Sequence, residues 1–160
     1  MKIYLAGDHA GFRLKSALLE HLPMLGHDVE DMGPLTLEPE DDYPDYVTPL
    51  ALKIVSEPEA IGIVLAGSGQ GEAMCANRIH GARAAVFYGK LPVGALDAEG
   101  GHSADGYDIV RLARKHNNAN ILSLGARFVS PEEADEAVRI FLSTAFDTTT
   151  ERHARRLNKF

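Results

Sequence analysis

The sequence has a single cysteine, no tryptophan and no long apolar run. Because Cys75 stands alone, no intramolecular disulfide can form, and zinc sites built from four cysteines are excluded. No apolar stretch approaches the roughly 20 residues that a membrane-spanning helix needs. The chain starts directly with a strand-like stretch, Ile3 to Ala6, without the pattern of a secretory signal. We therefore expect a cytoplasmic protein without a membrane partner.

Positive charge is also scarce, since 16 lysines and arginines face 23 aspartates and glutamates, for a net charge of −7. Nucleic-acid binding usually needs a basic surface, so nucleic acid is not expected to be the principal partner, whereas one small anion is still allowed. The charges are unevenly placed: the basic residues Arg152, Arg155, Arg156 and Lys159 crowd the C-terminus, and Glu38, Glu40, Asp41, Asp42 and Asp45 form an acidic segment. On charge alone, both clusters are interpreted as solvated surface.

A length of 160 residues with 45% hydrophobic residues is typical of one compact domain, so residues 1–160 are expected to form a single unit. Short β-branched runs alternate with segments of helical period, which predicts an α/β fold with a parallel sheet covered by helices on both faces. The expected strands are Lys2–Ala6, Asp28–Met32, Ile61–Ala66, Ala84–Tyr88 and Asn120–Leu124.

Apolar stripes and cap residues predict the helices between these strands. The stripes comprise Leu14, Leu18, Leu22 and Leu25, then Val47, Leu50, Ala51, Ile54 and Val55, and then Ile109, Leu112, Ala113 and His116. Ser130, Pro131 and Glu133 predict the start of another helix with a capping box. The glycine-containing stretch from Leu91 to Gly106 is too long for an ordinary connection, and it is expected to be either a lid or a tolerated surface insertion.

Two glycine-containing segments follow predicted strands, where open parallel sheets bind their ligands. Residues 7–11 follow the first strand and residues 67–72 follow the third. The alternate glycines Gly67, Gly69 and Gly71 can present backbone N–H groups to a phosphate or to a developing enediolate oxygen, or they can simply form a tight turn. Their spacing does not match that of dinucleotide or nucleoside-triphosphate loops.

Glu72 closes the second segment. A carboxylate there can be an electrostatic helix cap, or it can be a base beside an oxyanion-stabilising loop, the pair of groups that removes a proton next to a carbonyl. Asp8 and His9 after the first strand can be a hydrogen-bonded loop pair, and His116 on an apolar stripe is usually a core or boundary residue. The residues by themselves leave these alternatives open.

Taken together, the residues resemble the ribose-5-phosphate isomerase B family, which also includes galactose-6-phosphate and allose-6-phosphate isomerases. The matching segments, in family order, are Ala6–Phe12, Asp42–Tyr46, Gly67–Glu72, Ala76–Arg78, His116–Asn120, Gly125–Arg127 and Glu151–Arg156. The resemblance implies a Rossmann-like three-layer α/β/α sandwich with a five-stranded parallel sheet. It also implies a homodimer or dimer of dimers with sites at the interface, and no cofactor or metal.

The same resemblance implies a role for each matching residue in the isomerisation of a sugar phosphate, ribose 5-phosphate above all. Glu72 is the implied base, with Ser68 and the backbone of Gly69 to Gly71 stabilising the enediolate. The remaining implied site residues are Asp8 at the sugar hydroxyls or ring oxygen, Tyr43 lining the pocket, His116 of the neighbouring subunit for ring opening, and Asn117 at a hydroxyl. The phosphate is bound by His9 together with Arg127, Arg152 and Arg156, and the resemblance implies that these arginines lie across the interface. The basic tail, about residues 148–160, then completes the partner's site.

Two departures from the family pattern bear on this transfer. Many members place a cysteine base where this chain has Ala66, so the match is to the subgroup with glutamate at the position of Glu72, and Cys75 is interpreted as a packed side chain. The stretch from Leu91 to Gly106 is longer than the family pattern and precedes the helix of His116. The alternatives are a hexose 6-phosphate isomerase, a non-catalytic sugar-phosphate-binding protein and a general nucleotide-binding module.

Overall fold

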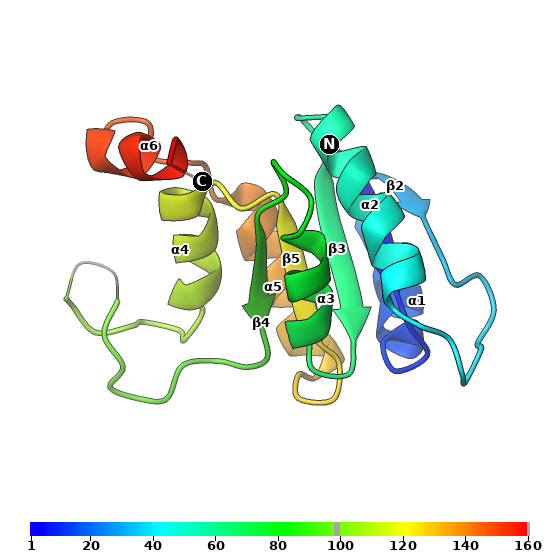
Figure 1. Ribbon diagram of the computed structural model, residues 1–160. Helices are drawn as coiled ribbons and strands as arrows, with labels where there is room; N and C mark the ends of the chain where they lie inside the picture. The colour runs from blue at the N-terminus through cyan, green and yellow to red at the C-terminus, as the bar shows by residue number, and fades with distance from the viewer. Residues whose placement is uncertain (98–99, 160) are drawn as a thin grey trace.

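The computed structural model describes residues 1–97 and 100–159, and strands and helices alternate along most of this chain (Figure 1). The elements are β1 (Lys2–Gly7), α1 (Phe12–Met24), β2 (Asp28–Asp31), α2 (Pro44–Ser56), β3 (Ile61–Ala66), α3 (Gln70–Ala76), β4 (Ala84–Phe87), α4 (Asp108–Asn117), β5 (Ile121–Gly125), α5 (Pro131–Ser143) and α6 (Glu151–Leu157). Among the described residues, no helix is both long and apolar enough to cross a membrane.

The strands form one parallel sheet in the order β2-β1-β3-β5-β4. Each predicted strand is present, and its ends lie within one residue of the predicted ones. The central strand β3 is buried along its whole length. A strand covered on both faces has no solvent side, which is why its sequence is continuously apolar rather than alternating.

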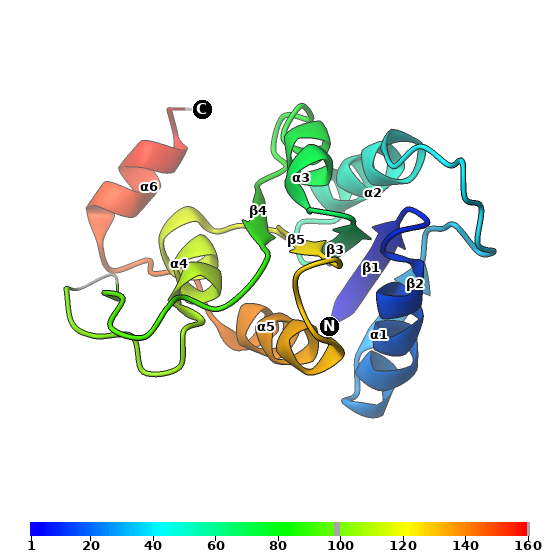
Figure 2. The ribbon, with the colours of Figure 1, turned by 90° about the horizontal axis from the view of Figure 1, so that it is seen from below.

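Helices cover both faces of the sheet, which confirms the three-layer α/β/α architecture (Figure 2). Side chains that alternate along β1 and β3 divide between two cores, with Leu5 and Leu65 in one and Ala6 and Val64 in the other. The first core also contains buried residues of α1, α4 and α5, and the second contains buried residues of α2 and α3.

Three apolar residues of the predicted stripes lie outside the core. Leu25 is 44% exposed because α1 ends one residue earlier, at Met24. Val55 and Ile109 are also exposed. In α4 the predicted Ala113 is buried, but it packs together with Val110 and not with Ile109, so the packed face is rotated from the one that was predicted.

In the C-terminal part of the chain, one prediction about helices is confirmed and one helix was missed. The capping box at the start of α5 is present, because Ser130 Oγ accepts from the Glu133 N–H at 3.2 Å and Glu133 Oε2 accepts from the Ser130 N–H at 3.1 Å. The basic tail contains the helix α6, which the sequence analysis did not anticipate. In the stretch from Leu91 to Gly106, Leu96 and His102 form an antiparallel bridge, while residues 98–99 lie outside the described residues.

The chain changes face between two neighbouring strands. From β1 it continues into α1 on one face, and from β3 it continues into α3 on the other. In open α/β sheets a crevice opens at such a point, beyond the carboxyl ends of the two strands. The register pairs Gly7 with Leu65 and Ala66 with Gly125, so the loops after β1, β3 and β5 all start at one level.

The loop after β1 is pressed against β3, and glycine makes this approach possible. A Cβ atom at Gly11 would lie 2.0 Å from the Leu65 carbonyl oxygen, although the backbone of Gly11 has an ordinary right-handed conformation. The cost of a side chain there is therefore steric and not conformational.

We predict that Gly11→Ala lowers the free energy of unfolding by about 1–3 kcal/mol, because the added methyl group must push two backbone segments apart. Chemical denaturation measures the change. Gly101→Ala is the matched control: the nearest atom to its added methyl belongs to the Asp97 side chain, which can rotate, so its effect should stay within about 0.5 kcal/mol. Equal losses in the two variants would contradict the steric explanation.

Candidate active site

Loops from three strands bring candidate residues together at the carboxyl edge of the sheet. Arg127, from the loop after β5, lies over the glycine loop, since a Cβ at Gly67 would be 3.1 Å from the guanidinium carbon. Tyr43, just before α2, contacts the same loop from another direction, with its hydroxyl 2.7 Å from where a Cβ of Gly71 would be. These two glycines leave space that the arginine and the tyrosine occupy.

The glycine loop packs closely against the end of β5. Gly69 has a left-handed backbone with φ of +77°, and a Cβ there would be 3.1 Å from the Gly125 nitrogen. The buried Ser123 hydroxyl donates to the Gly69 carbonyl oxygen at 2.6 Å. On the exposed side, Ser68 Oγ accepts from the Gln70 N–H at 3.3 Å. The loop is thus held rigidly on β5, as an anion-stabilising loop needs to be.

Glu72 lies in the first turn of α3 and is only 4% exposed. Its Oε2 atom is buried and has no hydrogen-bond partner in the described part of the chain. Burial raises the pKa of this carboxyl group, and the charge of Asp8 raises it further, although backbone N–H groups of Glu72 and Gly69 act in the opposite direction. A carboxylate in such surroundings accepts a proton readily, which suits a general base.

Asp8 is also buried, directly after β1. Its Oδ1 atom accepts from the N–H groups of Ala10 at 2.9 Å and Gly11 at 3.2 Å, and its own N–H donates to the Leu65 carbonyl oxygen at 3.1 Å. These bonds fix the carboxylate at the start of the loop. Asp8 is therefore a second acidic group in the electrostatic surroundings of Glu72.

His9 contacts Asp41, a residue that the sequence analysis did not single out. Asp41 Oδ1 accepts from the His9 N–H at 3.0 Å and lies 2.8 Å from the ring Nδ1. The Asp41 side chain is 5% exposed, whereas that of His9 is 36% exposed. The acidic segment was interpreted as solvated, and this is wrong for Asp41. Only its proximity to His9 in space distinguishes it from its acidic neighbours, so no signal in the sequence could have found it.

The other candidate residues lie near the amino ends of the strands, opposite to the carboxyl ends where the glycine loop lies. His116 and Asn117 are at the carboxyl end of α4, just before the chain enters β5, and α6 packs beside this end of the helix (Figure 1). Arg152 and Arg156 are exposed on α6. Within one chain, the structure therefore brings Asp8, His9, Tyr43, Gly67 to Glu72 and Arg127 together, but not these four residues. The resemblance implied that Arg127 comes from across an interface, whereas it lies over Gly67 of its own chain.

His116 stacks on a second histidine. The rings of His116 and His153 are 4.1 Å apart between centroids and nearly parallel, at 16°. His153 is buried, and its Nε2 lies 3.9 Å from Asp147 Oδ2. Burial lowers the pKa of His116, and the neighbouring His153 lowers it further, so the ring is kept neutral near pH 7. A neutral imidazole can both accept and donate a proton.

Among residues 1–97 and 100–159, no cluster of three or more histidine, cysteine, aspartate or glutamate side chains could hold a metal ion. Cys75 packs between α3 and α2, with its Sγ 3.4 Å from Thr48 Oγ1, as expected for a packed side chain.

Comparison with known proteins identifies the class. The model of the Ribose/Galactose Isomerase family matches residues 3–92 and 103–160. Ribose-5-phosphate isomerase B of Mycobacterium tuberculosis (strain CDC 1551 / Oshkosh) is 36% identical over 99% of this chain and 86% of its own length. A crystal structure of a ribose 5-phosphate isomerase from Thermotoga maritima has 41% identity and a TM-score of 0.81, covering 99% of this chain and 95% of that one. The structure of ribose-5-phosphate isomerase B from Mycoplasma genitalium with bound ribulose-5-phosphate has 34% identity and a TM-score of 0.84, covering 99% and 92%.

The fold and these matches define an α/β isomerase. The chain belongs to the Ribose/Galactose Isomerase family, and within it to the type that its relatives represent, ribose-5-phosphate isomerase B. The family model leaves residues 93–102 unmatched, so the middle of the stretch from Leu91 to Gly106 departs from the family pattern. Whether that stretch closes over a site stays a prediction.

The burial of Glu72 gives a prediction about stability. Because its pKa is higher in the folded than in the unfolded protein, the folded state holds more protons between the two pKa values, and stability falls as the pH rises through that window. We expect Glu72→Gln to be more stable than the unchanged protein at neutral pH, with a gap that closes below a pH of about 4. Thermal unfolding at several pH values measures it.

Glu20→Gln, which neutralises an exposed glutamate on α1, is the control and should show no such pH-dependent gain. The stability difference between Glu72→Gln and the unchanged protein is the quantity to compare. If Glu72→Gln has a smaller advantage at neutral pH than at pH 4, burial of the charge carries no penalty.

Proposed function

We propose that the protein interconverts ribose 5-phosphate and ribulose 5-phosphate through a cis-enediolate, with Glu72 as the base. The observation that carries this proposal is a buried carboxylate with an unpartnered oxygen beside a rigid glycine loop. The relative from Mycoplasma genitalium, whose structure is described with bound ribulose-5-phosphate, supports the choice of sugar.

The chemistry needs a proton to move between adjacent carbons. Starting from the open-chain aldose, Glu72 removes the proton on C2, and the electrons of that C–H bond shift so that negative charge develops on the carbonyl oxygen at C1. Ser68 and the backbone N–H groups of Gly69 to Gly71 stabilise this charge. A proton passes from the C2 hydroxyl to the C1 oxygen, Glu72 returns its proton to C1, and the oxygen on C2 becomes the ketone. A positioned base typically contributes about 10²–10⁴-fold, and one oxyanion donor about 10²–10³-fold.

The ends of the substrate are assigned to the remaining residues. Asp8, held by backbone N–H groups, contacts the sugar hydroxyls or the ring oxygen. His9 and Arg127 bind the phosphate, and the guanidinium lies over Gly67, within reach of a ligand on the glycine loop. Phosphate binding holds the reacting carbons against Glu72, so that binding energy distant from the reaction assists the chemical step.

The site is completed by a second copy of the chain. His116, Asn117, Arg152 and Arg156 lie at the opposite sheet edge of their own chain, so they can reach a glycine loop only in a neighbouring molecule. His116, neutral near pH 7, then assists ring opening, Asn117 holds a hydroxyl, and the two arginines complete the phosphate site.

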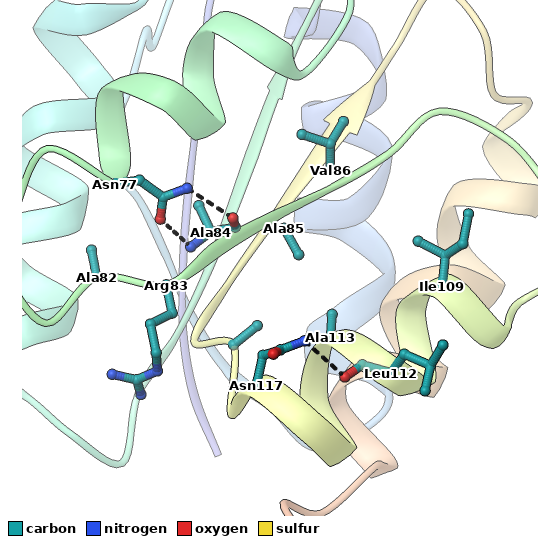
Figure 3. Close-up of a pocket in the computed structure, with 11 residues that line it drawn as sticks. Asn77, Ala82, Arg83, Ala84, Ala85, Val86, Ile109, Leu112, Ala113 and Asn117 are labelled. Atoms are coloured by element: carbon teal, nitrogen blue, oxygen red, sulfur yellow. Dashed lines mark hydrogen bonds between the residues drawn. The ribbon is translucent and has the colours of Figure 1, made fainter. Parts of the chain in front are cut away.

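A groove beside the edge strand suits this second copy (Figure 3). Its volume is about 610 Å³, and its walls come from β4, α4 and the end of α3. The lining includes the apolar Ala85, Val86, Ile109 and Leu112, and Asn77 exchanges two hydrogen bonds with the backbone of Ala84, at 2.7 Å and 3.0 Å. An apolar groove on a strand edge is the kind of surface that a homodimer covers.

We expect the protein to convert ribose 5-phosphate, and Glu72→Gln to lower kcat by about 10²–10⁴-fold while inorganic phosphate still binds, because the amide cannot accept the proton. A coupled assay with ribose, allose and galactose phosphates measures the activity. Faster turnover of a hexose phosphate would reassign the sugar. Activity of Glu72→Gln equal to that of the unchanged protein would rule out Glu72 as the base.

Mixing two inactive variants tests the shared site. In a heterodimer of Glu72→Gln with His116→Asn, one site combines both defects and the other combines neither. Random reassortment should therefore restore about a quarter of the unmutated activity, because half of the dimers are mixed and half of their sites are intact. The double variant mixed with itself is the control. Absence of recovery after verified subunit exchange would contradict a site built from two chains.

A further inference from the structure

We propose that Asp41 is a positioning residue for the phosphate site: it clamps the His9 ring by Nδ1 and leaves Nε2, as a charged donor, to the phosphate dianion. This role rests on the proposed function only in that His9 meets the phosphate of the substrate. Asp41 lies outside the short sequence segments that carry the family resemblance.

The contact geometry favours a clamp over a general loop contact. One oxygen of Asp41 meets both the backbone N–H and the ring Nδ1 of the same residue, at 3.0 Å and 2.8 Å. Two bonds to one residue fix the direction of the ring as well as the position of the loop. When Nδ1 donates to a carboxylate, the free Nε2 is at the opposite side of the ring.

The burial of the two partners is unequal. The carboxylate of Asp41 is almost wholly covered, and its Oδ2 has no hydrogen-bond partner within the described ranges 1–97 and 100–159. A buried carboxylate oxygen without a partner is costly, and a carboxylate that served only to close a loop could turn outward and be hydrated like its exposed neighbours Glu40 and Asp42. The arrangement instead places the negative charge of the Asp41 carboxylate next to the more exposed imidazole of His9.

The charged groups around His9 determine its protonation. The hydrogen bond to Asp41 raises the pKa of His9 above its ordinary value, and the charges of Asp8 and Asp41 add to this. Partial burial and the guanidinium of Arg127 act in the opposite direction. Bound phosphate favours the imidazolium further. When protonated, His9 adds a second cation beside Arg127 in a protein whose net charge is −7 with its histidines neutral.

The sign of the effect separates this role from simple electrostatics. Asp41 is itself negative, so its charge alone repels an anion, and Asp41→Asn would tighten anion binding if nothing else changed. In the proposed role the same substitution weakens binding, because the asparagine oxygen can keep both hydrogen bonds but no longer stabilises the imidazolium. The two explanations thus predict opposite changes.

The test measures binding of sulfate, which remains a dianion from pH 5 to pH 9, so only the protein titrates. NMR titration of the His9 ring and of sulfate binding is carried out on the unchanged protein, Asp41→Asn and the exposed control Glu40→Gln. We expect Asp41→Asn to lower the pKa of His9 and to weaken sulfate binding about tenfold near pH 7.5, since loss of a paired charge shifts a histidine pKa by about one unit. At pH 5.5, where the ring is protonated in all three proteins, the weakening should disappear, and Asp41→Asn should bind sulfate at least as tightly as the unchanged protein.

Glu40→Gln should leave the pKa of His9 and the affinity for sulfate nearly unchanged. In a His9→Gln background, Asp41→Asn should no longer weaken binding, because the residue that it acts through is absent. If Asp41→Asn does not fold, the unchanged protein decides: a His9 pKa at or below about 6.5, or a neutral ring with its proton on Nε2, overturns the proposal.

Tighter sulfate binding by Asp41→Asn near pH 7.5, or equal weakening at every pH, also overturns it. Because no arm of the experiment uses turnover, a protein that lacks isomerase activity but shows the pH-dependent loss would refute the proposed function and leave the role of Asp41 standing. In an active protein, the same substitution should lower kcat/KM above neutral pH and lose this effect at pH 5.5.

Discussion

The candidate active site depends on the close approach of the loop after β1 to the carboxyl end of β3. Gly7 and Gly11 allow it, since a Cβ atom at either position would lie within 2.3 Å of the Leu65 carbonyl oxygen. The chain enters helices on opposite faces after these two strands, so the same contact forms the floor of the crevice. Without it, Asp8 would not be near enough to act on Glu72, and His9 would not meet the charge of Arg127.

Two buried carboxylates at this crevice have surroundings that change the proton affinity of a site residue. Glu72 and Asp41 each have one buried oxygen without a hydrogen bond inside the described chain, an arrangement that lowers stability. The environments then act differently. Burial, and then the nearby carboxylate of Asp8, raise the affinity of Glu72 for a proton, whereas Asp41 has an imidazole nearby and promotes protonation of that ring. In the proposed reaction the first serves proton transfer and the second serves phosphate binding.

The sequence predicted those features that local chemistry determines. Continuous apolar runs located β3 and its neighbours, and Ser130 with Glu133 located the start of α5, because strands and caps depend on adjacent residues. Features that depend on tertiary contacts were not predictable. The exposure of Ile109 follows from how α4 packs, the helix α6 has no apolar stripe that would reveal it, and the burial of Asp41 follows from contact with a residue 32 positions away. The roles of the site residues, carried over by resemblance, stay predictions.

The distribution of positive charge gives a physical reason for a shared site. An acidic protein that binds a dianion needs several cations around one point, and mutual repulsion makes such a cluster costly in an empty single chain. Here the cations are divided: His9 and Arg127 lie at one edge of the sheet, and Arg152 and Arg156 lie on α6 at the other. In the proposed dimer the two sets converge only when two chains meet, so the phosphate site and its specificity arise from assembly. The substrate phosphate then offsets the repulsion that the convergence creates, and we infer that substrate binding strengthens the dimer by the same free energy with which dimer formation strengthens substrate binding.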